Sequence, residues 1–412
     1  MVAAAPLSSS AVATLFRLSS SIAFVGGFLT SVVSLLVPRL KLTLGLGYAE
    51  ALLVQLAFHA SYLLFAIPIT LVIIRTGYMR AIATGLAIMC AGCLALVAAQ
   101  AALDFAAILA ALLLLAAGIT FLQIASNTAV VVVGPSAQAA SRLTLTQGFN
   151  SLGTVLGPLL CAQLLLSATA TGVGTASSIG AASLPFAGSA LVLGVLAFAF
   201  VARRDLLPPL PRSEQPTLRR LPVLLADRRL RLGTCAMFAY VGAEVTIGAL
   251  LTSYLMLPTI VAASPVAAGR IVSLYWGGAM LGRFAGAYLL RRIAPARLLR
   301  MAAGGAALLA TAATVLGGVA GAAALIAVGL CNAIMYPTIY ALALPRAEDA
   351  APLGSMLLCM AVVGGAVVPM LTGVAADAFG LAPAFALPAL CYVAVAGFAW
   401  FCLGAASARK TP

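Results

Sequence analysis

The chain has 412 residues, of which 64% are hydrophobic and only 8% are charged. Soluble proteins carry about 25% charged residues, so this composition excludes an ordinary soluble domain and indicates a polytopic membrane protein. The formal net charge of +14 does not indicate nucleic-acid binding, because the basic residues lie in short breaks between apolar stretches. Those stretches show no sustained alternation of polar and apolar residues, which favours spanning helices over a β-barrel.

Twelve apolar stretches are long enough to span a bilayer, for which about 20 residues are needed. In chain order they lie at 17–38, 48–74, 79–100, 103–133, 141–168, 183–203, 231–257, 265–291, 296–318, 320–344, 351–376 and 381–403. The one long polar stretch, residues 204–230, contains the Pro-rich sequence LPPLPRSEQP, which cannot form a spanning helix. It predicts a linker between two six-helix halves, residues 1–203 and 231–412.

Basic residues are concentrated in the linker, in the breaks after predicted helices two and eight, and in the tail. The break after helix two holds Arg75 and Arg80, and eight arginines lie between Arg203 and Arg231. The breaks after helices three, five, nine and eleven hold none, and only Arg39 and Lys41, after helix one, disagree. By the positive-inside rule, we expect a multi-pass inner-membrane protein with both termini and the linker in the cytoplasm.

The two halves share landmarks at a constant spacing. A shift of 211 residues brings Gly118 onto Gly329, Gly153 onto Gly364 and Pro158 onto Pro369. Parallel six-helix repeats with a solute site between them near the membrane midplane are typical of the major facilitator class.

Amide side chains interrupt two neighbouring apolar helices of the first half. Gln123 and Asn127 are four residues apart on one helix, and Gln147 and Asn150 are three apart on the next, so each pair shares a helix face. Lipid offers an amide no partner, whereas amides both donate to and accept from the hydroxyls of a polar solute. We expect them to line a solute pathway; hydrogen bonding between helices is the alternative.

Two ionisable residues lie inside predicted helices and are candidates for coupling. Glu244 lies near the centre of helix seven, where a charged carboxylate costs about 2.5–3.5 kcal/mol. It is predicted to bind a proton, a substrate hydroxyl, or both in turn; a structural ion pair or a permanently protonated acid is the alternative. His59, the single histidine, lies in helix two and is either a proton shuttle or a neutral packing group.

The second half supplies aromatic and polar side chains for the same pathway. Trp276, Asn332 and Tyr336 are predicted to complete a sugar site from this side, although a lone aromatic residue in a helix is more often a packing residue. Arg283 lies well inside helix eight toward its cytoplasmic end, and we interpret it as a conformational latch. Cys90 and Cys93 form a C-x-x-C without a second ligand pair, so we expect packing residues and no metal site.

Several motifs resemble the fucose–galactose–glucose:proton symporter branch of the major facilitator superfamily. They read FLQIASN and SRLTLTQGFNSLGTVLGP in helices four and five, then YVGAEVTIG, LGRFAGAYLLRR and YPTIYALAL in helices seven, eight and ten. The resemblance extends from about Phe24 to Gly380. It implies hexose transport by alternating access, coupled to protons in the best-known members.

The resemblance also assigns roles to individual positions. Sugar-contacting amides of the branch match Gln147 and Asn150, whereas the carboxylates of its fucose transporters match Ser34 and Gln123, which do not ionise. Those transporters have an amide in place of Glu244, and the combination of Gln123 with Glu244 is more similar to the glucose/galactose transporters. Three alternatives follow: coupling through Glu244, facilitated diffusion, or coupling to another ion such as Na⁺.

We therefore expect an all-α membrane protein of the major facilitator fold that transports a hexose. We expect no enzymatic activity, cofactor or nucleic-acid partner, and a monomer in the lipid bilayer. An exporter of drug-like or amphipathic solutes is the first alternative, and the clustered amides argue against it. A non-transporting receptor or a membrane enzyme is the second, but the sequence shows neither a reactive polar cluster nor a large soluble domain.

Overall fold

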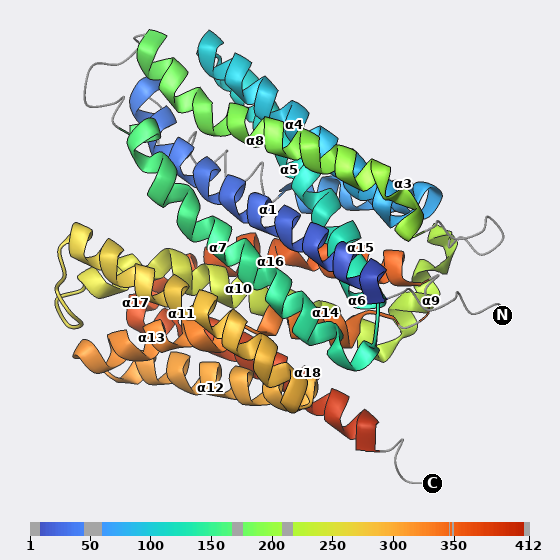
Figure 1. Cartoon of the computed structure of the whole chain (residues 1–412). Helices are drawn as coiled ribbons and strands as arrows, with labels where there is room; N and C mark the ends of the chain where they lie inside the picture. The colour runs from blue at the N-terminus through green and yellow to red at the C-terminus, as the bar shows by residue number, and fades with distance from the viewer. Residues whose placement is uncertain are drawn as a thin grey trace. The chain divides into compact units, whose positions relative to one another are not determined.

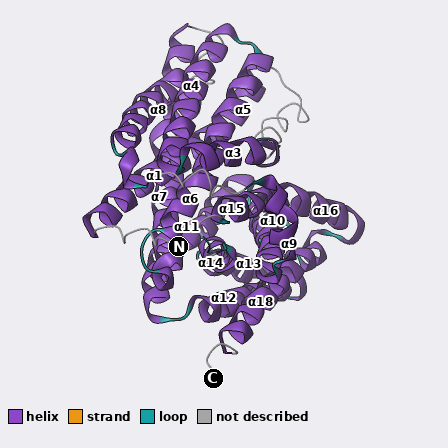
Figure 2. Ribbon diagram, turned by 90° about the vertical axis from the view of Figure 1, so that its right-hand side faces the viewer, coloured by secondary structure: helices purple, strands orange, loops and turns teal. Residues whose placement is uncertain are grey.

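The computed structural model of the protein describes residues 9–44, 60–166, 176–207, 217–345, 347 and 350–407. Within these ranges the secondary structure is helical and includes no strand (Figures 1 and 2). The all-α prediction is confirmed.

Each predicted span overlaps, in its described part, with one helix or with consecutive helices. The first six are α1 (Ser9–Leu44), α3 (Ala66–Thr76), α4 (Tyr78–Ala102), α5 (Phe105–Phe121) with α6 (Asn127–Val132), α7 (Ala139–Leu166) and α8 (Ala176–Ala202). The last six are α10 (Arg228–Met256), α11 (Pro265–Arg292), α12 (Pro295–Val315), α13 (Gly318–Asn332) with α14 (Met335–Ala343), α15 (Ala351–Met360) with α16 (Gly364–Phe379), and α17 (Leu381–Ala384) with α18 (Ala386–Ser407).

Nine helical stretches among the described residues are long and apolar enough to cross a membrane. The predicted spans on α7, described as far as Leu166, and on α11 are helical but are not among these nine, and α3 is a shorter apolar helix. Both α7 and α11 carry polar side chains of the predicted site, namely Gln147 and Asn150 on α7 and Arg283 on α11.

Several helix starts are set by side-chain caps at the breaks that the sequence predicts. Asp104 Oδ1 accepts hydrogen bonds from the backbone N–H groups of Ala106 and Ala107 at 2.9 and 3.2 Å, which caps α5. Asp227 caps α10 in the same way, through the backbone N–H of Arg229 at 2.8 Å. Acidic side chains at these positions satisfy the first free N–H groups of a helix, so these two carboxylates are structural.

The described part of the predicted linker consists mainly of short helical segments, and its last three residues begin α10. Residues Arg204–Leu206 and Leu218–Arg220 form 3-10 turns, and Leu221–Ala226 forms the short helix α9. Residues 208–216 lie outside the described ranges. The division into residues 1–203, 204–230 and 231–412 stays a prediction.

Contacts divide the chain into two compact units, which we treat separately. Unit 1 comprises Met1–Gly134, Phe149–Thr217 and Ala347–Cys359, and unit 2 comprises Pro135–Gly148, Leu218–Arg346 and Met360–Pro412. Each unit thus includes one short segment from the opposite half of the sequence. The predicted repeat shift carries Pro135–Gly148 onto 346–359, which is the other exchanged segment with one additional residue, so the exchange follows the repeat.

Repeat-related glycines also have the same role in both units. In unit 1, a Cβ at Gly153 would collide with the backbone carbonyl of Phe24 on α1. In unit 2, a Cβ at Gly364 would collide with the backbone carbonyl of Phe238 on α10. Small residues permit this close approach of helix backbones, which is a common way for membrane helices to pack.

Candidate functional site

The predicted site residues fall into two sets, one in each unit. The set in unit 1 comprises Gln123, Asn127 and Asn150. The set in unit 2 comprises Gln147, Glu244, Trp276, Arg283, Asn332 and Tyr336. His59 lies outside the described residues.

A π-helical turn carries the first amide pair of unit 1. Leu122–Ser126 forms this turn between α5 and α6, and Gln123 lies within it. Asn127 is 4% exposed, and its Nδ2 donates to Gln123 Oε1 at 2.7 Å. The two amides therefore lie on one face, as their spacing predicts, and Asn127 fixes the orientation of the more accessible Gln123. Wide π turns inside α-helices are frequent at functional sites, and the sequence pattern alone did not indicate one here.

Two contacts of the π turn come from residues that the sequence did not single out. The buried Tyr62 side chain hydrogen-bonds with Gln123. Ser355 Oγ, from the segment Ala347–Cys359, donates to the backbone carbonyl of Ile124 at 3.0 Å. These contacts fix the backbone and the side chain at the position where Gln123 presents its amide.

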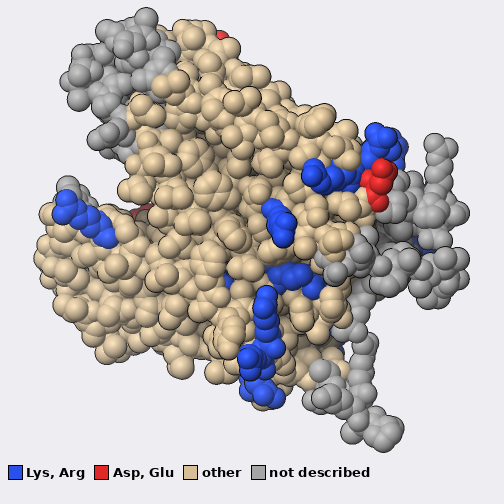
Figure 3. All heavy atoms as spheres, in the orientation of Figure 1, with Lys and Arg blue, Asp and Glu red and all other residues tan. Residues whose placement is uncertain are grey.

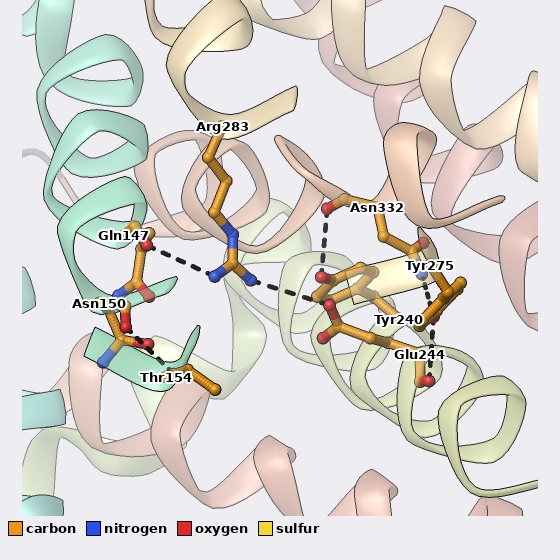
Figure 4. A network of polar contacts seen from close by, with 8 residues as sticks. All are labelled: Gln147, Asn150, Thr154, Tyr240, Glu244, Tyr275, Arg283 and Asn332. Carbon is orange, nitrogen blue, oxygen red and sulfur yellow. Dashed lines mark hydrogen bonds and ion pairs between the residues drawn. The ribbon is translucent and has the colours of Figure 1, made fainter. Parts of the chain in front are cut away.

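Asn150 holds two helices of unit 1 together. Its Nδ2 donates to the backbone carbonyl of Ala23 on α1 at 2.9 Å, and Thr154 Oγ1, one turn further along α7, donates to the Asn150 carbonyl at 3.1 Å (Figure 4). The hydrogen bond to α1 is the interhelical role that the sequence left as an alternative. The Asn150 side chain is only half-buried, and its Oδ1 is an acceptor that can also meet a hydroxyl group.

A buried ion pair is the central feature of the unit 2 set. Arg283 Nη2 on α11 lies 3.8 Å from Glu244 Oε1 on α10, and the two side chains are 15% and 14% exposed. Arg283 Nη1 also donates to the backbone carbonyl of Gln147 on α7 at 3.4 Å (Figure 4). Arg283 therefore joins the segment Pro135–Gly148 to the carboxylate of α10. Its latch role stays a prediction.

The same segment of α7 packs closely on α11 along its length. Ser141 Oγ donates to the backbone carbonyl of Ala287 at 2.6 Å. Gly148 lies against the ring of Phe284, so that a Cβ there would be 3.1 Å from a ring carbon. The guanidinium group thus binds a helix that is already held by packing.

Tyrosines and an asparagine support the carboxylate helix from behind. The Tyr275 hydroxyl donates to the backbone carbonyl of Glu244 at 3.1 Å and accepts from Asn332 Nδ2 at 2.8 Å. The Tyr240 hydroxyl donates to the backbone carbonyl of Asn332 at 3.2 Å (Figure 4). Tyr240, Tyr275 and Asn332 are fully buried, so Asn332 acts in this conformation by holding Tyr275 in place.

Trp276 presents the exposed aromatic surface of this set. Its side chain is 42% exposed, and its ring packs edge-to-face on Tyr275 with centroids 5.0 Å apart. Gly248 allows the indole to lie close to α10, because a Cβ there would be 2.6 Å from a ring carbon. Tyr336 is half-buried, with its ring 6.1 Å from that of Tyr340. Trp276 is therefore held in place by Tyr275 and α10, and it remains partly exposed.

The cysteines that the sequence singled out take part in packing. Cys90 and Cys93 are free thiols, and Cys90 Sγ lies 3.2 Å from the backbone carbonyl of Ala190, where α4 meets α8. In the described ranges, no group of three or more His, Cys, Asp or Glu side chains is arranged to hold a metal ion.

Long apolar helices that repeat in two units and carry polar side chains within the helices are typical of one class of protein, the polytopic membrane carriers. The sequence profile of the Major Facilitator Superfamily matches residues 19–351. The chain belongs to this superfamily of membrane transporters, which are not enzymes.

Individual relatives support the predicted branch of the superfamily. A glucose/galactose transporter of Brucella abortus is 38% identical over 375 residues, covering 90% of each chain. The L-fucose-proton symporter of Escherichia coli is 28% identical over 413 residues, covering 94% of this chain and 92% of the symporter. The crystal structure of the transporter FucP in its outward conformation matches 95% of this chain with a TM-score of 0.87 and 25% sequence identity. The resemblance to the fucose–galactose–glucose branch is confirmed.

Proposed function

We propose that the protein carries a hexose of the glucose, galactose or fucose type across the inner membrane by alternating access. The main support is the 38% identity, over 90% of both chains, to a glucose/galactose transporter. The polar groups described above suit such a substrate, since a sugar needs both donors and acceptors for its hydroxyls and a flat apolar face for its ring.

In this proposal, neutral amides bind the sugar hydroxyls. Gln123 is held in one orientation by Asn127, and Gln147 and Asn150 lie three residues apart on α7. Trp276 is exposed and braced by Tyr275, which suits it to pack on a sugar ring. Asn332 contributes by supporting Tyr275, and Tyr336 is a further contact from unit 2.

We assign proton coupling to Glu244, and Arg283 is the residue that responds to the charge of Glu244. A carboxylate that is 14% exposed and 3.8 Å from a guanidinium is stable as an anion only while that partner stays. Protonation of Glu244 removes the attraction and leaves Arg283 with the carbonyl of Gln147 on α7. The charge state of Glu244 would thereby change how strongly α10 is tied to the segment Pro135–Gly148. His59 is kept as a secondary proton carrier.

The remaining expectations form part of the same proposal. The protein would act as a monomer, with both termini and the linker in the cytoplasm, where the arginines at the end of α8 and the start of α10 would lie. Protons are the proposed coupling ion, because the ion pair that includes Glu244 responds directly to protonation.

Counterflow in proteoliposomes tests the substrate assignment. Vesicles loaded with unlabelled glucose, galactose or fucose should take up the labelled form of the transported sugar. A pH gradient with the outside more acidic than the inside should increase net accumulation of that sugar. Absence of exchange with every hexose would defeat the sugar assignment.

Coupling is tested separately with Glu244→Gln. This variant should keep counterflow but lose the accumulation driven by the pH gradient, because an amide cannot bind the proton. Asp205→Asn is the matched control, since the Asp205 side chain is 94% exposed and lies outside the network. Full accumulation by Glu244→Gln would place the coupling group elsewhere.

A further inference from the structure

Unit 1 has a groove-shaped cavity that the proposed sugar pathway does not use. It has a volume of about 580 Å³, within the range of roughly 300–1,000 Å³ typical of sites for small ligands. Its walls come from the first half of α1, the middle of α7 and the second half of α8. The apolar walls include Phe16, Phe24, Phe149 and Val192.

The packing of α1 on α7 explains where this groove begins. The two helices touch at Gly153, which lies against the carbonyl of Phe24, and at Gly27, which lies against the carbonyl of Asn150. Such close contact holds them together at that level. Phe16 lies two helical turns before Phe24 on α1, so the groove extends from this crossing toward the N-terminal end of α1.

The outer wall of the groove belongs to a surface that suits lipid. Val192 is 46% exposed, and Val195 and Phe198, on the same helix, are 61% and 75% exposed. Large apolar side chains with this exposure on a membrane-spanning helix are in contact with acyl chains in a bilayer. An acyl chain can therefore enter the groove from the side.

The polar wall of the groove consists of a cation beside a buried hydroxyl. Arg17 lines the cavity and is exposed, and it makes no ion pair within the described part of the chain. Ser20 also lines the cavity, is 7% exposed, and its Oγ has no hydrogen-bond partner among the described residues. The neighbouring Ser21 differs, because its Oγ donates to the Arg17 carbonyl at 3.0 Å in the usual way of helical serines.

Charge at this end of unit 1 is predominantly positive. The N-terminal end of α1 and the C-terminal end of α8 lie at the same end of the unit (Figure 1). Arg203 and Arg204 follow directly after α8, with Asp205 as the accompanying acid. In the space-filling view, blue side chains interrupt a surface that is otherwise almost free of charge (Figure 3). Basic residues near the membrane surface attract anionic lipid headgroups.

We propose that this groove is a binding site for one anionic phospholipid. The phosphate would accept hydrogen bonds from the Arg17 guanidinium and the Ser20 hydroxyl, and one acyl chain would lie along Phe16, Phe24, Phe149 and Val192. A guanidinium matches phosphate oxygens with paired donors, and its aliphatic stem is compatible with an apolar surface. The lipid would bridge α1 and α8 on the N-terminal side of the point where α1 crosses α7.

Native mass spectrometry of the purified full-length protein tests the headgroup contact. Delipidated protein is titrated with phosphatidylglycerol, phosphatidylcholine or inorganic phosphate, and bound molecules are counted. Wild-type protein should retain one phosphatidylglycerol in preference to phosphatidylcholine, and phosphate alone should not compete. Arg17→Ala should weaken phosphatidylglycerol binding by about tenfold, since a charge-assisted hydrogen bond is lost, and Arg17→Lys should recover part of it.

Arg203→Ala is the control for general surface charge and should weaken binding much less than Arg17→Ala, because Arg203 does not line the groove. Equal phosphatidylglycerol binding by Arg17→Ala and the wild type, or equal loss in Arg17→Ala and Arg203→Ala, would overturn the headgroup assignment. Preference for inorganic phosphate would indicate a soluble-anion site and would also overturn the proposal.

The acyl-chain contact has its own matched pair of variants. Val192→Trp fills the groove from α8, whereas Val195→Trp adds the same indole to an exposed position of the same helix outside the groove. The first should lose phosphatidylglycerol binding by about tenfold and the second should keep it, with equal melting temperatures for both. Equal binding by the two variants would show that the acyl chain does not occupy the groove.

Discussion

The two units place different kinds of polar chemistry inside the same repeated helical plan. In unit 1 the polar contacts around Gln123 and Asn127 are made by neutral side chains. In unit 2 a carboxylate and a guanidinium, Glu244 and Arg283, lie 3.8 Å apart with tyrosines behind them. Neutral amides bind hydroxyl groups at any pH, whereas a buried ion pair changes with protonation. In the proposed mechanism, coupling therefore belongs to unit 2, whereas recognition combines the neutral amides of unit 1 with Gln147 and Trp276 of unit 2.

The largest expected effect is loss of the charge balance in unit 2. Arg283→Ala leaves Glu244, 14% exposed, without its counter-charge, and should lower the stability of the protein by about 3–5 kcal/mol. The double variant Glu244→Gln/Arg283→Met should regain most of this, because both charges are gone. Thermal melting of the purified variants in one detergent measures both.

The comparison variant in unit 1 is Gln123→Met/Asn127→Leu, which removes a hydrogen-bonded neutral pair and should destabilise the protein much less. If Arg283→Ala melted at the wild-type temperature while the unit 1 variant unfolded early, the electrostatic contrast between the units would be wrong.

Equivalent glycines should give equivalent, intermediate losses of stability in the two units. Gly153→Ala and Gly364→Ala each place a methyl group against a backbone carbonyl, of Phe24 and Phe238 respectively, and should each cost about 1–3 kcal/mol. Gly188→Ala and Gly397→Ala are controls, because their added Cβ atoms meet nothing within 4 Å. Melting temperatures of the four variants provide the test, and a loss confined to one of the first two would show that the repeat is not matched in packing.

Sugar affinity should separate the roles of Gln123 and Asn127, the paired amides of unit 1. Gln123→Met should raise the half-saturating sugar concentration in counterflow by about tenfold, since an unmet hydroxyl costs about 1–3 kcal/mol. Asn127→Leu should raise it less, because Asn127 is 4% exposed and acts by orienting Gln123. Glu244→Gln serves as the comparison in unit 2 and should leave the half-saturating concentration of exchange closer to wild type. A larger effect of Asn127→Leu than of Gln123→Met would reverse the assigned roles.

The smallest effects are expected where each exchanged segment is hydrogen-bonded to its adopted unit. Ser141→Ala removes the 2.6 Å hydrogen bond to Ala287 in unit 2, and Ser355→Ala removes the 3.0 Å hydrogen bond to Ile124 in unit 1. Interhelical hydrogen bonds in membranes are worth about 0.6 kcal/mol on average, so each variant should melt slightly below wild type. Ser273→Ala is the control, because Ser273 is an exposed serine on α11. Melting curves will show whether either loss of stability exceeds that of this surface variant.

Much of the fold could be predicted because hydropathy is a local property. The described helices coincide with the predicted spans, and the repeat landmarks Gly153 and Gly364 have the same packing role in both units. The family resemblance was likewise carried by short motifs and was confirmed over nearly the whole chain. The candidate site was only partly accessible in this way. Gln123 and Asn127 pair as their spacing predicts, but the π turn that presents Gln123 has no signature in the pattern of apolar residues.

By itself, the sequence determined that this is a membrane protein, where its helices run, and that Glu244 is an acid inside one of them. The tertiary structure decided what that acid does, because its partner Arg283 is 39 residues away and comes from another helix. It also decided that Arg283 binds the carbonyl of Gln147, 136 residues distant. Helix rotation and close backbone packing set these contacts, and neither is encoded in the local alternation of polar and apolar residues.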